Sequence, residues 1–445
     1  MTERPVEELM LRLAVPSIVT MLISAIYNMA DTFFVARLDR QSPAAVGVVF
    51  SYMALIQAVA FFFGQGSGNS ISRALGARRT DDAAAMAATG FFSALIVGLV
   101  VTSLGFVLMD PLLRLLGSTE TILPPARAYM RYILIGTPFI MCSFVMNNQM
   151  RFQGNAWMGM IGITTGAVLN IALDPLLIFG LGMGVAGASF ATMVSQCVSF
   201  TILFRLAGRR DGIPIRLSSF RPTLSQYGEI AAAGLPSLGR QGLASVSVAY
   251  MNQLAGIFGD LAIAALSVVN RTVMFATSVV LGFGQGFQPV CGFNFGARKF
   301  IRVRRAFWFG VLITTGYCAA LSLLGHLLAP DVIAIFRPND GELIALGARA
   351  LRYHCVVYTV NGFIIMTNMY LQNTRRTFSA SLLAASRQGL LLLPALHLGR
   401  RFLGLTGIMT AQPTADALSF CLALPLAFAA LHSMGRTEEP LWKNS

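Results

Sequence analysis

The sequence carries little charge for its length. Acidic and basic residues together make up 12% of its 445 residues, about half of what a soluble domain usually has. Apolar residues make up 55%, and the mean hydropathy is +0.67. This composition excludes an ordinary soluble domain.

Cysteine and histidine are also scarce, and neither follows the spacing of a disulfide framework or a metal site. The six cysteines include no CxxC pair, and the four histidines show no ligand spacing. We therefore expect small buried cysteines and no resident metal or cofactor. No Walker motif is present, and the GxGxxG match at residues 182–187 has no preceding strand. An integral membrane enzyme would need a cluster of His, Ser or acidic residues at one membrane interface, and the sequence shows none.

Long uncharged segments are abundant, and each of the longest exceeds the roughly 20 helical residues that cross a bilayer. These runs are residues 41–72, 83–109, 152–173, 175–204, 272–297 and 306–330. They predict an all-α integral membrane protein with twelve transmembrane helices. The expected spans are residues 11–38, 44–71, 84–109, 128–150, 157–180, 185–206, 228–257, 261–292, 306–329, 345–371, 378–399 and 403–432.

The charges that remain indicate an orientation. The first segment follows MTERPVEELMLR, which is acidic and lacks a small-residue cleavage site, so we expect a retained first helix. With both termini in the cytoplasm, the inner side collects roughly twice as many Lys and Arg as the outer side. The inner group is mainly Arg73, Arg78, Arg79, the loop 205–221, the cluster 298–305, Arg375, Arg376 and Arg387. The net charge of +14 is thus an orientation signal of a multi-pass membrane protein and predicts no nucleic-acid partner.

The sequence repeats itself at an offset of 220 residues. FFGQGSGNSISRALGARR at residues 62–79 matches GFGQGFQPVCGFNFGARK at residues 282–299 in Phe-Gly-Gln-Gly and in Gly-Ala-Arg. Gly184, Gly187 and Ala191 likewise match Gly404, Gly407 and Ala411. We predict two six-helix lobes, residues 1–205 and 228–445, joined by a cytoplasmic linker at 206–227. An even number of helices in each lobe makes the repeat parallel, with a central cavity between the lobes.

Most of the repeated motif predicts architecture. Glycines at small-x-small spacing allow close helix approach in lipid, and glutamines between them can hydrogen-bond across that contact. These packing residues are Gly64, Gln65, Gly66, Gly284, Gln285 and Gly286. Gly-Ala-Arg is expected to end each helix at the cytoplasmic face. Pro16 and Pro236 each remove a helical hydrogen bond, which predicts either a hinge or a static kink.

Three acids lie well inside predicted spans: Asp31, Asp174 and Asp416. A charge there costs about 2.5–3.5 kcal/mol on insertion scales, so each is a candidate functional residue. Asp31 and Asp174 both lie six residues before the outward end of their helix, about 9 Å below the boundary. For Asp416 we expect an ion pair with Arg240 or Arg271 within the membrane.

Two further polar residues are predicted at about the same membrane depth as Asp31 and Asp174, and the four side chains form one predicted layer. Asn170 lies one turn before Asp174 on the same face, and Thr192 lies at about 12 Å depth on the next helix. Two carboxyls in an apolar pocket cannot both ionise cheaply, which favours a proton-loading site. The same oxygens could hold Na⁺, so the coupling ion stays open at this point.

Several segments together resemble the multidrug and toxic compound extrusion (MATE) transporters, of the bacterial MepA/DinF-like branch. They are YNMADTFFVARL in span one, LNIALDPLLIFGLGMGVAGASFAT across spans five and six, GLPSLGRQGLASV in span seven, GQGFQPVCGFNFGARK in span eight and GLTGIMTAQPTAD in span twelve. The resemblance implies twelve helices in two lobes and cation-coupled export of small organic, often cationic, compounds. It also implies a cation site at Asp31, Asn170, Asp174 and Thr192, with a less secure match at Asn147.

One departure from the family pattern bears on the coupling ion. Some Na⁺-driven relatives carry acids in spans seven and ten, where this chain has Arg240, Tyr250, Asn252, Asn361 and Asn368. We therefore predict an antiporter in a prokaryotic cytoplasmic (inner) membrane, coupled preferentially to H⁺ through the N-terminal lobe and acting as a monomer among membrane lipids. The alternatives are Na⁺-coupled drug export and a flippase for a lipid-linked precursor.

Overall fold

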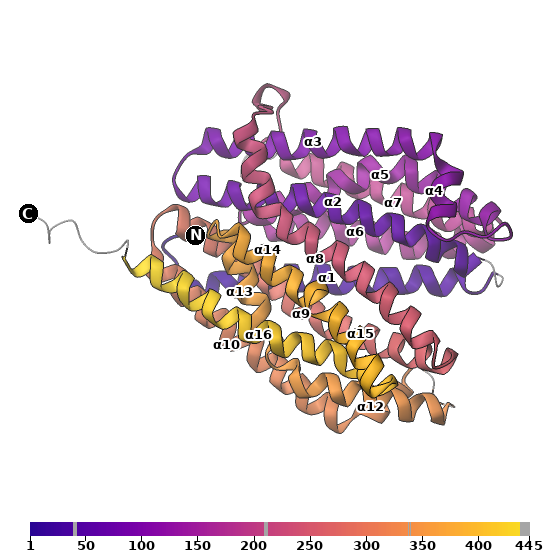
Figure 1. Cartoon of the computed structure of the whole chain (residues 1–445). Helices are drawn as coiled ribbons and strands as arrows, with labels where there is room; N and C mark the ends of the chain where they lie inside the picture. The colour runs from indigo at the N-terminus through magenta and orange to yellow at the C-terminus, as the bar shows by residue number, and fades with distance from the viewer. Residues whose placement is uncertain (39–41, 209–211, 337, 339, 437–445) are drawn as a thin grey trace, which may run out of the picture. The chain divides into compact units, whose positions relative to one another are not determined.

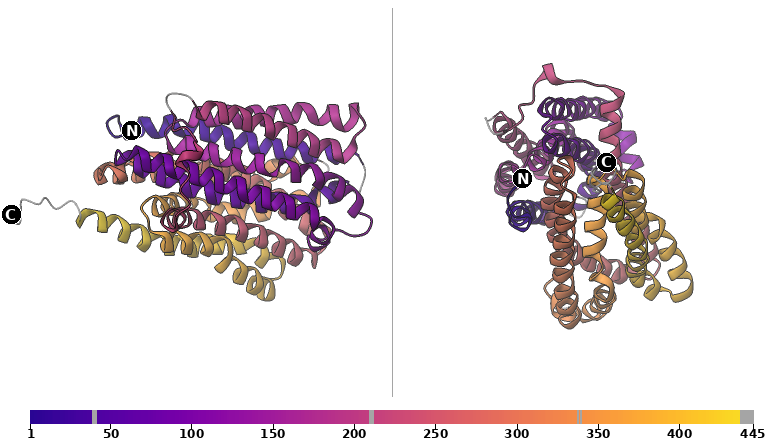
Figure 2. Two further views of the ribbon diagram at one scale, coloured as in Figure 1. Left: turned by 90° about the horizontal axis from the view of Figure 1, so that it is seen from above. Right: turned by 90° about the vertical axis from the view of Figure 1, so that its left-hand side faces the viewer.

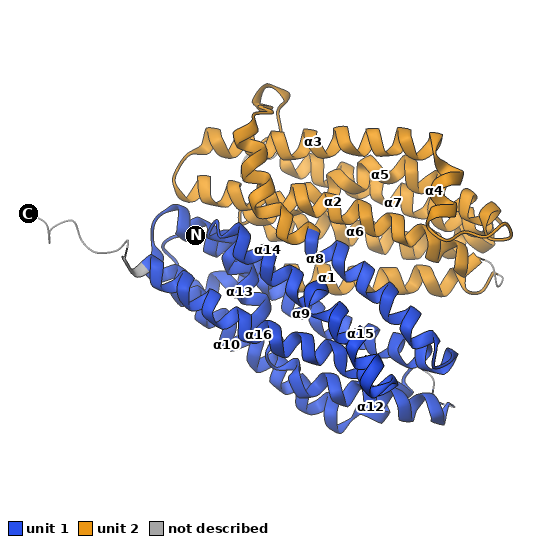
Figure 3. Ribbon diagram, viewed as in Figure 1, with its two compact units in different colours: residues 1–14, 239–445 blue, residues 15–238 orange. Residues whose placement is uncertain are grey.

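The computed structural model describes residues 1–38, 42–208, 212–336, 338 and 340–436. The parts of the predicted linker and C-terminal lobe at residues 209–211, 337, 339 and 437–445 lie outside the described residues. The chain forms two compact units, of which unit 1 contains Met1–Ala14 and Gly239–Ser445 and unit 2 contains Val15–Leu238 (Figure 3). No strand occurs among the described residues, and the all-α prediction is confirmed.

Unit 2 is built from most of the first helix, six further helices with two short helical turns, and the start of the eighth (Figure 1). Their bounds are α1 (Val6–Val35), α2 (Ser42–Gly76), α3 (Thr80–Val107), α4 (Met109–Leu115), α5 (Leu123–Phe152), α6 (Ala156–Pro175), η1 (Leu176–Gly180), α7 (Gly184–Ala207), η2 (Leu217–Ser219) and α8 (Leu224–Gly256). Helix α5 is the centre of this unit, because it packs against α2, α3, α6 and α7.

Unit 1 contains the rest of α8, the N-terminal turns of α1 and the remaining helices (Figure 3). Their bounds are α9 (Asp260–Gly296), α10 (Phe300–Leu327), α11 (Ala329–Ala334), α12 (Gly341–Tyr358), α13 (Asn361–Asn373), α14 (Thr377–Ala385), η3 (Ser386–Leu390), α15 (Leu392–Leu403) and α16 (Leu405–Arg436). Within each unit the long helices run alongside one another (Figure 2).

Nine helices among the described residues are long and apolar enough to cross a membrane. The other three predicted spans are helical too. The seventh is α8, the tenth is α12 followed by α13, and the eleventh is α14, the π-helical turn η3 and α15. The twelve-helix prediction is therefore confirmed, with interruptions in the tenth and eleventh spans that the hydropathy pattern does not reveal.

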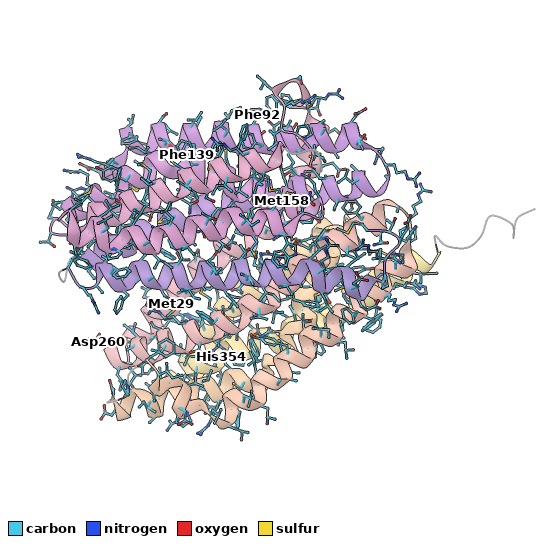
Figure 4. The ribbon with its side chains drawn as sticks, turned by 180° about the vertical axis from the view of Figure 1, so that it is seen from behind. Met29, Phe92, Phe139, Met158, Asp260 and His354 are labelled. Carbon is cyan, nitrogen blue, oxygen red and sulfur yellow. The ribbon has the colours of Figure 1, made fainter. Side chains whose placement is uncertain are left out.

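Aromatic rings fill the space between the helices of unit 2. Phe139 on α5 packs edge-on against Phe200 on α7, with ring centroids 5.4 Å apart. Phe92 on α3 packs against Phe220 at 5.6 Å, and Figure 4 shows the side chains of Phe92 and Phe139 on this unit. Edge-to-face packing of this kind adds to the simple burial of apolar area.

Two helices begin in one unit and continue in the other. Residues 1–14 of the chain group with unit 1, and residues 224–238 of α8 group with unit 2. The changes of unit fall at 14/15 and 238/239, close to Pro16 and Pro236 in the sequence. The predicted lobe boundaries at 205 and 228, and the hinge role of the two prolines, stay predictions.

Polar contacts attach the start of α8 to unit 2. Arg73 on α2 donates to Glu229 Oε2 at 2.9 Å, and Thr89 on α3 donates to Gln226 Oε1 at 2.5 Å. In unit 1 the start of α1 is attached similarly, since Arg305 on α10 donates to Glu7 Oε1.

The second glycine of each repeated motif makes a close helix contact. A Cβ atom on Gly66 would lie 2.3 Å from the carbonyl oxygen of Ile230, and one on Gly286 would lie 2.5 Å from the backbone nitrogen of Ala14. Both contacts are with backbone, so the neighbour cannot simply rotate away. Both glycines therefore lie where the predicted packing role requires a residue without a side chain.

Gln65 and the arginines of the motif add two details to this packing. Gln65 is buried, but its Oε1 has no hydrogen-bond partner among the described residues. Helices α2 and α9 end at Gly76 and Gly296, as expected. The left-handed residue that reverses the chain, however, is an arginine in both cases, Arg78 with φ 60° and Arg298 with φ 57°.

Substitution of the contact glycines tests this packing. We expect Gly66→Ala or Gly286→Ala to destabilise the fold by about 1–3 kcal/mol, because an overpacked contact forces the backbones apart. Gly47→Ala on α2 is the matched control, since a Cβ there meets nothing within 4 Å and alanine favours a helix. Thermal unfolding of purified protein would measure both effects, and equal midpoints for the Gly47 and Gly66 variants would contradict the assignment.

Candidate functional site

Asp31 lies on the second half of α1 and is 9% exposed. Tyr129 on α5 donates its hydroxyl to Asp31 Oδ2 at 3.3 Å. The other carboxyl oxygen, Oδ1, is buried without a hydrogen-bond partner among the described residues. Only one of the two carboxyl oxygens of Asp31 is therefore hydrogen-bonded, and the bond is to α5 at the centre of unit 2.

Asp174 is fully buried, and neither of its carboxyl oxygens has a hydrogen-bond partner among the described residues. It is followed by Pro175, which lacks the N–H that a regular helix would use, and the π-helical turn Leu176–Gly180 begins directly after it. Such turns concentrate at functional positions in helices. The local sequence therefore interrupts α6 next to this carboxyl.

Asn170 and Thr192 link α6 to α7 beside the two acids. Asn170 Nδ2 donates to Thr192 Oγ1 at 3.2 Å, and both side chains are buried. Asn170 Oδ1 has no partner among the described residues. A cavity of about 40 Å³ adjoins this pair and is also lined by Tyr27 and Ser195, which is room for two or three water-sized groups.

These side chains form one cluster in unit 2. Asp31 and Asp174 lie within electrostatic range of each other and of Tyr27 and Tyr129. The structure thus brings together the layer that helix depth predicted. Four oxygen atoms in the cluster are unpartnered among the described residues, two from Asp174 and one each from Asp31 and Asn170. The carboxyl oxygens can accept a proton, and all four can coordinate a hard cation.

Two tyrosines of the cluster are missing from the sequence prediction. Tyr27 lies four residues before Asp31, so the face rule for helices could have identified it. Tyr129 comes from α5, and no spacing in the sequence relates it to α1. Only the packing of α5 at the centre of the unit places its hydroxyl on Asp31.

Asn147 does not join the cluster. It lies on α5 eighteen residues after Tyr129, which is about 27 Å along a helix. A Cβ on Gly159, near the start of α6, would lie 2.9 Å from Asn147 Nδ2. The assignment of Asn147 to the cation site is therefore corrected, because the depth of this residue puts it at the opposite end of α5.

The C-terminal acid has a different environment. Asp416 on α16 is buried, and its Oδ1 accepts hydrogen bonds from Arg387 Nε and Gln412 Nε2, both at 2.9 Å. The predicted partners were Arg240 and Arg271, and neither pairs with it. Arg271 is exposed on α9.

The position of Arg387 is also corrected. It was counted with the inner basic residues, but it lies within the π-helical turn of the eleventh span, with its side chain 13% exposed. Pairing with Asp416 offsets the cost of burying both charges. Charge counting along the sequence cannot detect such a pair, because it assigns each arginine to one side of the membrane whether or not the side chain faces water.

The fold and the cluster define an all-helical membrane protein built on a repeated six-helix plan. The sequence profile of the MatE family matches residues 16–176 and 236–395, two segments that begin 220 residues apart. The chain belongs to the MATE family.

Curated relatives extend over nearly the whole chain. The multidrug export protein MepA of Staphylococcus haemolyticus is 25% identical over 430 residues, which cover 96% of this chain and 94% of the relative. MepA of Staphylococcus saprophyticus is 26% identical over 422 residues, covering 94% and 93%.

Solved structures agree with this assignment. An outward-facing multidrug resistance MATE family transporter of the MOP superfamily superposes with a TM-score of 0.92 at 26% identity, covering 98% of both chains. A MOP superfamily transporter from Pyrococcus furiosus Vc1 gives a TM-score of 0.91 with the same identity and coverage. The fold class and the family resemblance are both confirmed.

Carbodiimide labelling tests the difference between the buried acids. Dicyclohexylcarbodiimide enters apolar sites and reacts with protonated carboxyls. We expect it to modify Asp174 at neutral pH, because a buried carboxylate without hydrogen bonds is strongly disfavoured. Asp416, equally buried but paired with Arg387, serves as the internal control and should remain unmodified. Mass spectrometry of the labelled protein gives the answer, and equal labelling of the two acids would contradict the assignment.

Proposed function

We propose that this protein is a proton-coupled antiporter that exports small organic compounds, including cations, by alternating access. The observation that carries the proposal is the cluster of four unpartnered oxygens around Asp31 and Asp174. A buried carboxyl pair of this kind can hold a proton in one state and release it in another. The MepA relatives, named as multidrug export proteins, support drugs as the exported class.

Export of the compound is coupled to proton entry because the compound and the proton compete for the Asp31–Asp174 pair. Proton loading of the Asp31–Asp174 pair neutralises one carboxylate of the cluster, and loss of the proton restores a negative charge there that attracts a cationic compound. If exit of the compound and loading of the proton exclude one another, each cycle exchanges one for the other. The two repeated halves favour alternating access, since parallel repeats are a common plan of secondary transporters.

Na⁺ coupling is the second candidate, because carboxyl and amide oxygens are ligands that a hard cation prefers. Asp31, Asp174, Asn170 and Thr192 would be the ligands. The proton is favoured because unit 1 offers only one acid inside its described spans, Asp416, and that acid is already paired with Arg387.

The proposed setting is a prokaryotic cytoplasmic membrane, crossed several times, with both termini in the cytoplasm and the protein acting as a monomer. The excess of Lys and Arg in the loops between alternate spans supports this orientation. Arg78 and Arg298, both with positive φ, follow the ends of α2 and α9, and both would face the cytoplasm.

Transport in everted membrane vesicles tests the proposal. We expect ethidium uptake to be driven by an imposed pH gradient, and Asp31→Asn to lower it at least about tenfold, because the amide cannot cycle a proton. Asp81→Asn is the matched control, since Asp81 is an exposed acid at the start of α3.

The ion is identified by imposing the pH and Na⁺ gradients separately. Ethidium uptake driven only by a Na⁺ gradient would mean that the same site binds Na⁺ in place of the proton. A well-folded protein that moves no ethidium under either gradient would contradict drug antiport and favour the lipid flippase.

A further inference from the structure

Unit 1 contains a partly open cavity of about 30 Å³, lined in part by two arginines that are themselves partly buried. It is lined by Arg240 of α8, Asn368 of α13, Arg387 and Gln388 of η3, and apolar residues of α13 and α14. Two guanidinium groups therefore line one small space. No carboxyl belongs to the described residues that line it.

The two arginines are not equivalent. The charge of Arg387 is neutralised by Asp416, whose Oδ1 also accepts a hydrogen bond from Gln412. Arg240 has no such partner: its Nε atom is buried without a hydrogen bond among the described residues, and no ion pair involves it there. Asp416 is committed to Arg387, so the lining of the cavity carries an uncompensated positive charge.

The π-helical turn η3 carries Arg387 and is hydrogen-bonded to α8, the helix of Arg240. The turn displaces the helix at Ser386–Leu390, and the carbonyl of Gln388 accepts a hydrogen bond from Ser247 of α8 at 2.5 Å. This bond ties η3 to the helix that carries Arg240. Arg387 is thereby held between Asp416 on one side and the cavity on the other.

An unpaired guanidinium inside a membrane protein is costly and usually marks a functional position. Arginine presents several N–H donors in a planar fork that matches carboxylate, sulfonate or phosphate oxygens. We propose that this cavity binds the anionic group of an amphiphilic substrate, with Arg240 as its anchor and the Arg387–Asp416 pair as the element that positions it.

The proposal rests on the proposed export function and specifies the substrate class at the C-terminal unit. The cavity has room for only about two water-sized groups, so it would receive the anionic head alone. A zwitterion, with its anion at Arg240, fits this chemistry better than a simple organic cation. The anion could come from a soluble amphiphile or from a lipid headgroup, and the two sources are separable by experiment.

Binding to the full-length protein in dodecyl maltoside micelles, a detergent without phosphate or any other anion, tests the proposal without any ion gradient. Rhodamine B carries a cationic ring system and a carboxylate, and rhodamine B ethyl ester is the same dye without the anion. By fluorescence anisotropy we expect the wild-type protein to prefer rhodamine B by about tenfold, the size expected for a charge-assisted contact. We expect Arg240→Gln to remove the preference and Arg240→Lys to retain part of it.

Arg271→Gln is the matched control, because Arg271 is an exposed arginine of the same unit that does not line the cavity. It should retain the full preference. If Arg240→Gln binds the two dyes with the wild-type ratio, or if the wild-type protein shows no preference, the anion site is overturned. Ester uptake driven by a pH gradient and abolished by Asp31→Asn would show that export survives such a failure.

The same measurement in micelles supplemented with phosphatidylglycerol identifies the source of the anion. Weaker binding of rhodamine B to the wild-type protein, but not to Arg240→Gln, would mean that a lipid phosphate occupies the cavity. Unchanged binding of rhodamine B would mean that the anion comes from a soluble amphiphile. Each result agrees with an anion site at Arg240 and differs only in what fills it.

Discussion

The cost of burying a charge in hydrocarbon is the constraint on which this structure depends. Helices satisfy their own backbone groups in lipid, so the chain can cross the membrane with few side-chain hydrogen bonds. Each ionisable group that remains inside needs a partner, a proton or a ligand. Asp174 has no partner among the described residues, Asp416 has Arg387, and Arg240 has no acidic partner there. These three situations explain why the two units differ chemically while sharing one plan.

The repeat has preserved the scaffold and allowed the polar positions to diverge. At the offset of 220 residues, Gly66 corresponds to Gly286, and both make a contact with backbone too close for a side chain. Arg78 corresponds to Arg298, and both reverse the chain with a positive φ. The site residues have no such counterparts: Asp31 corresponds to Met251, and Asp174 to Pro394. Each unit therefore holds its helices by the same contacts and offers a different chemistry in its interior.

Interruptions of helices place the chemistry in both units. In unit 2 a π-helical turn follows Asp174, and in unit 1 another contains Arg387. A regular helix satisfies all its backbone groups and turns its side chains at a fixed 100° per residue. A π-helical turn shifts the face that follows it, so a polar side chain can point into the unit where the hydrophobic pattern alone would place an apolar one.

The sequence by itself determined the helical class, the twelve spans, the repeat and the acids of the N-terminal site, because hydropathy and helix depth depend only on local order along the chain. The tertiary structure alone decided that Tyr129 donates to Asp31, that Asn147 lies at the far end of α5, and that Asp416 pairs with Arg387 in place of Arg240. These pairings depend on how each helix is rotated against its neighbours, and on a π-helical turn that leaves no clear mark in hydropathy.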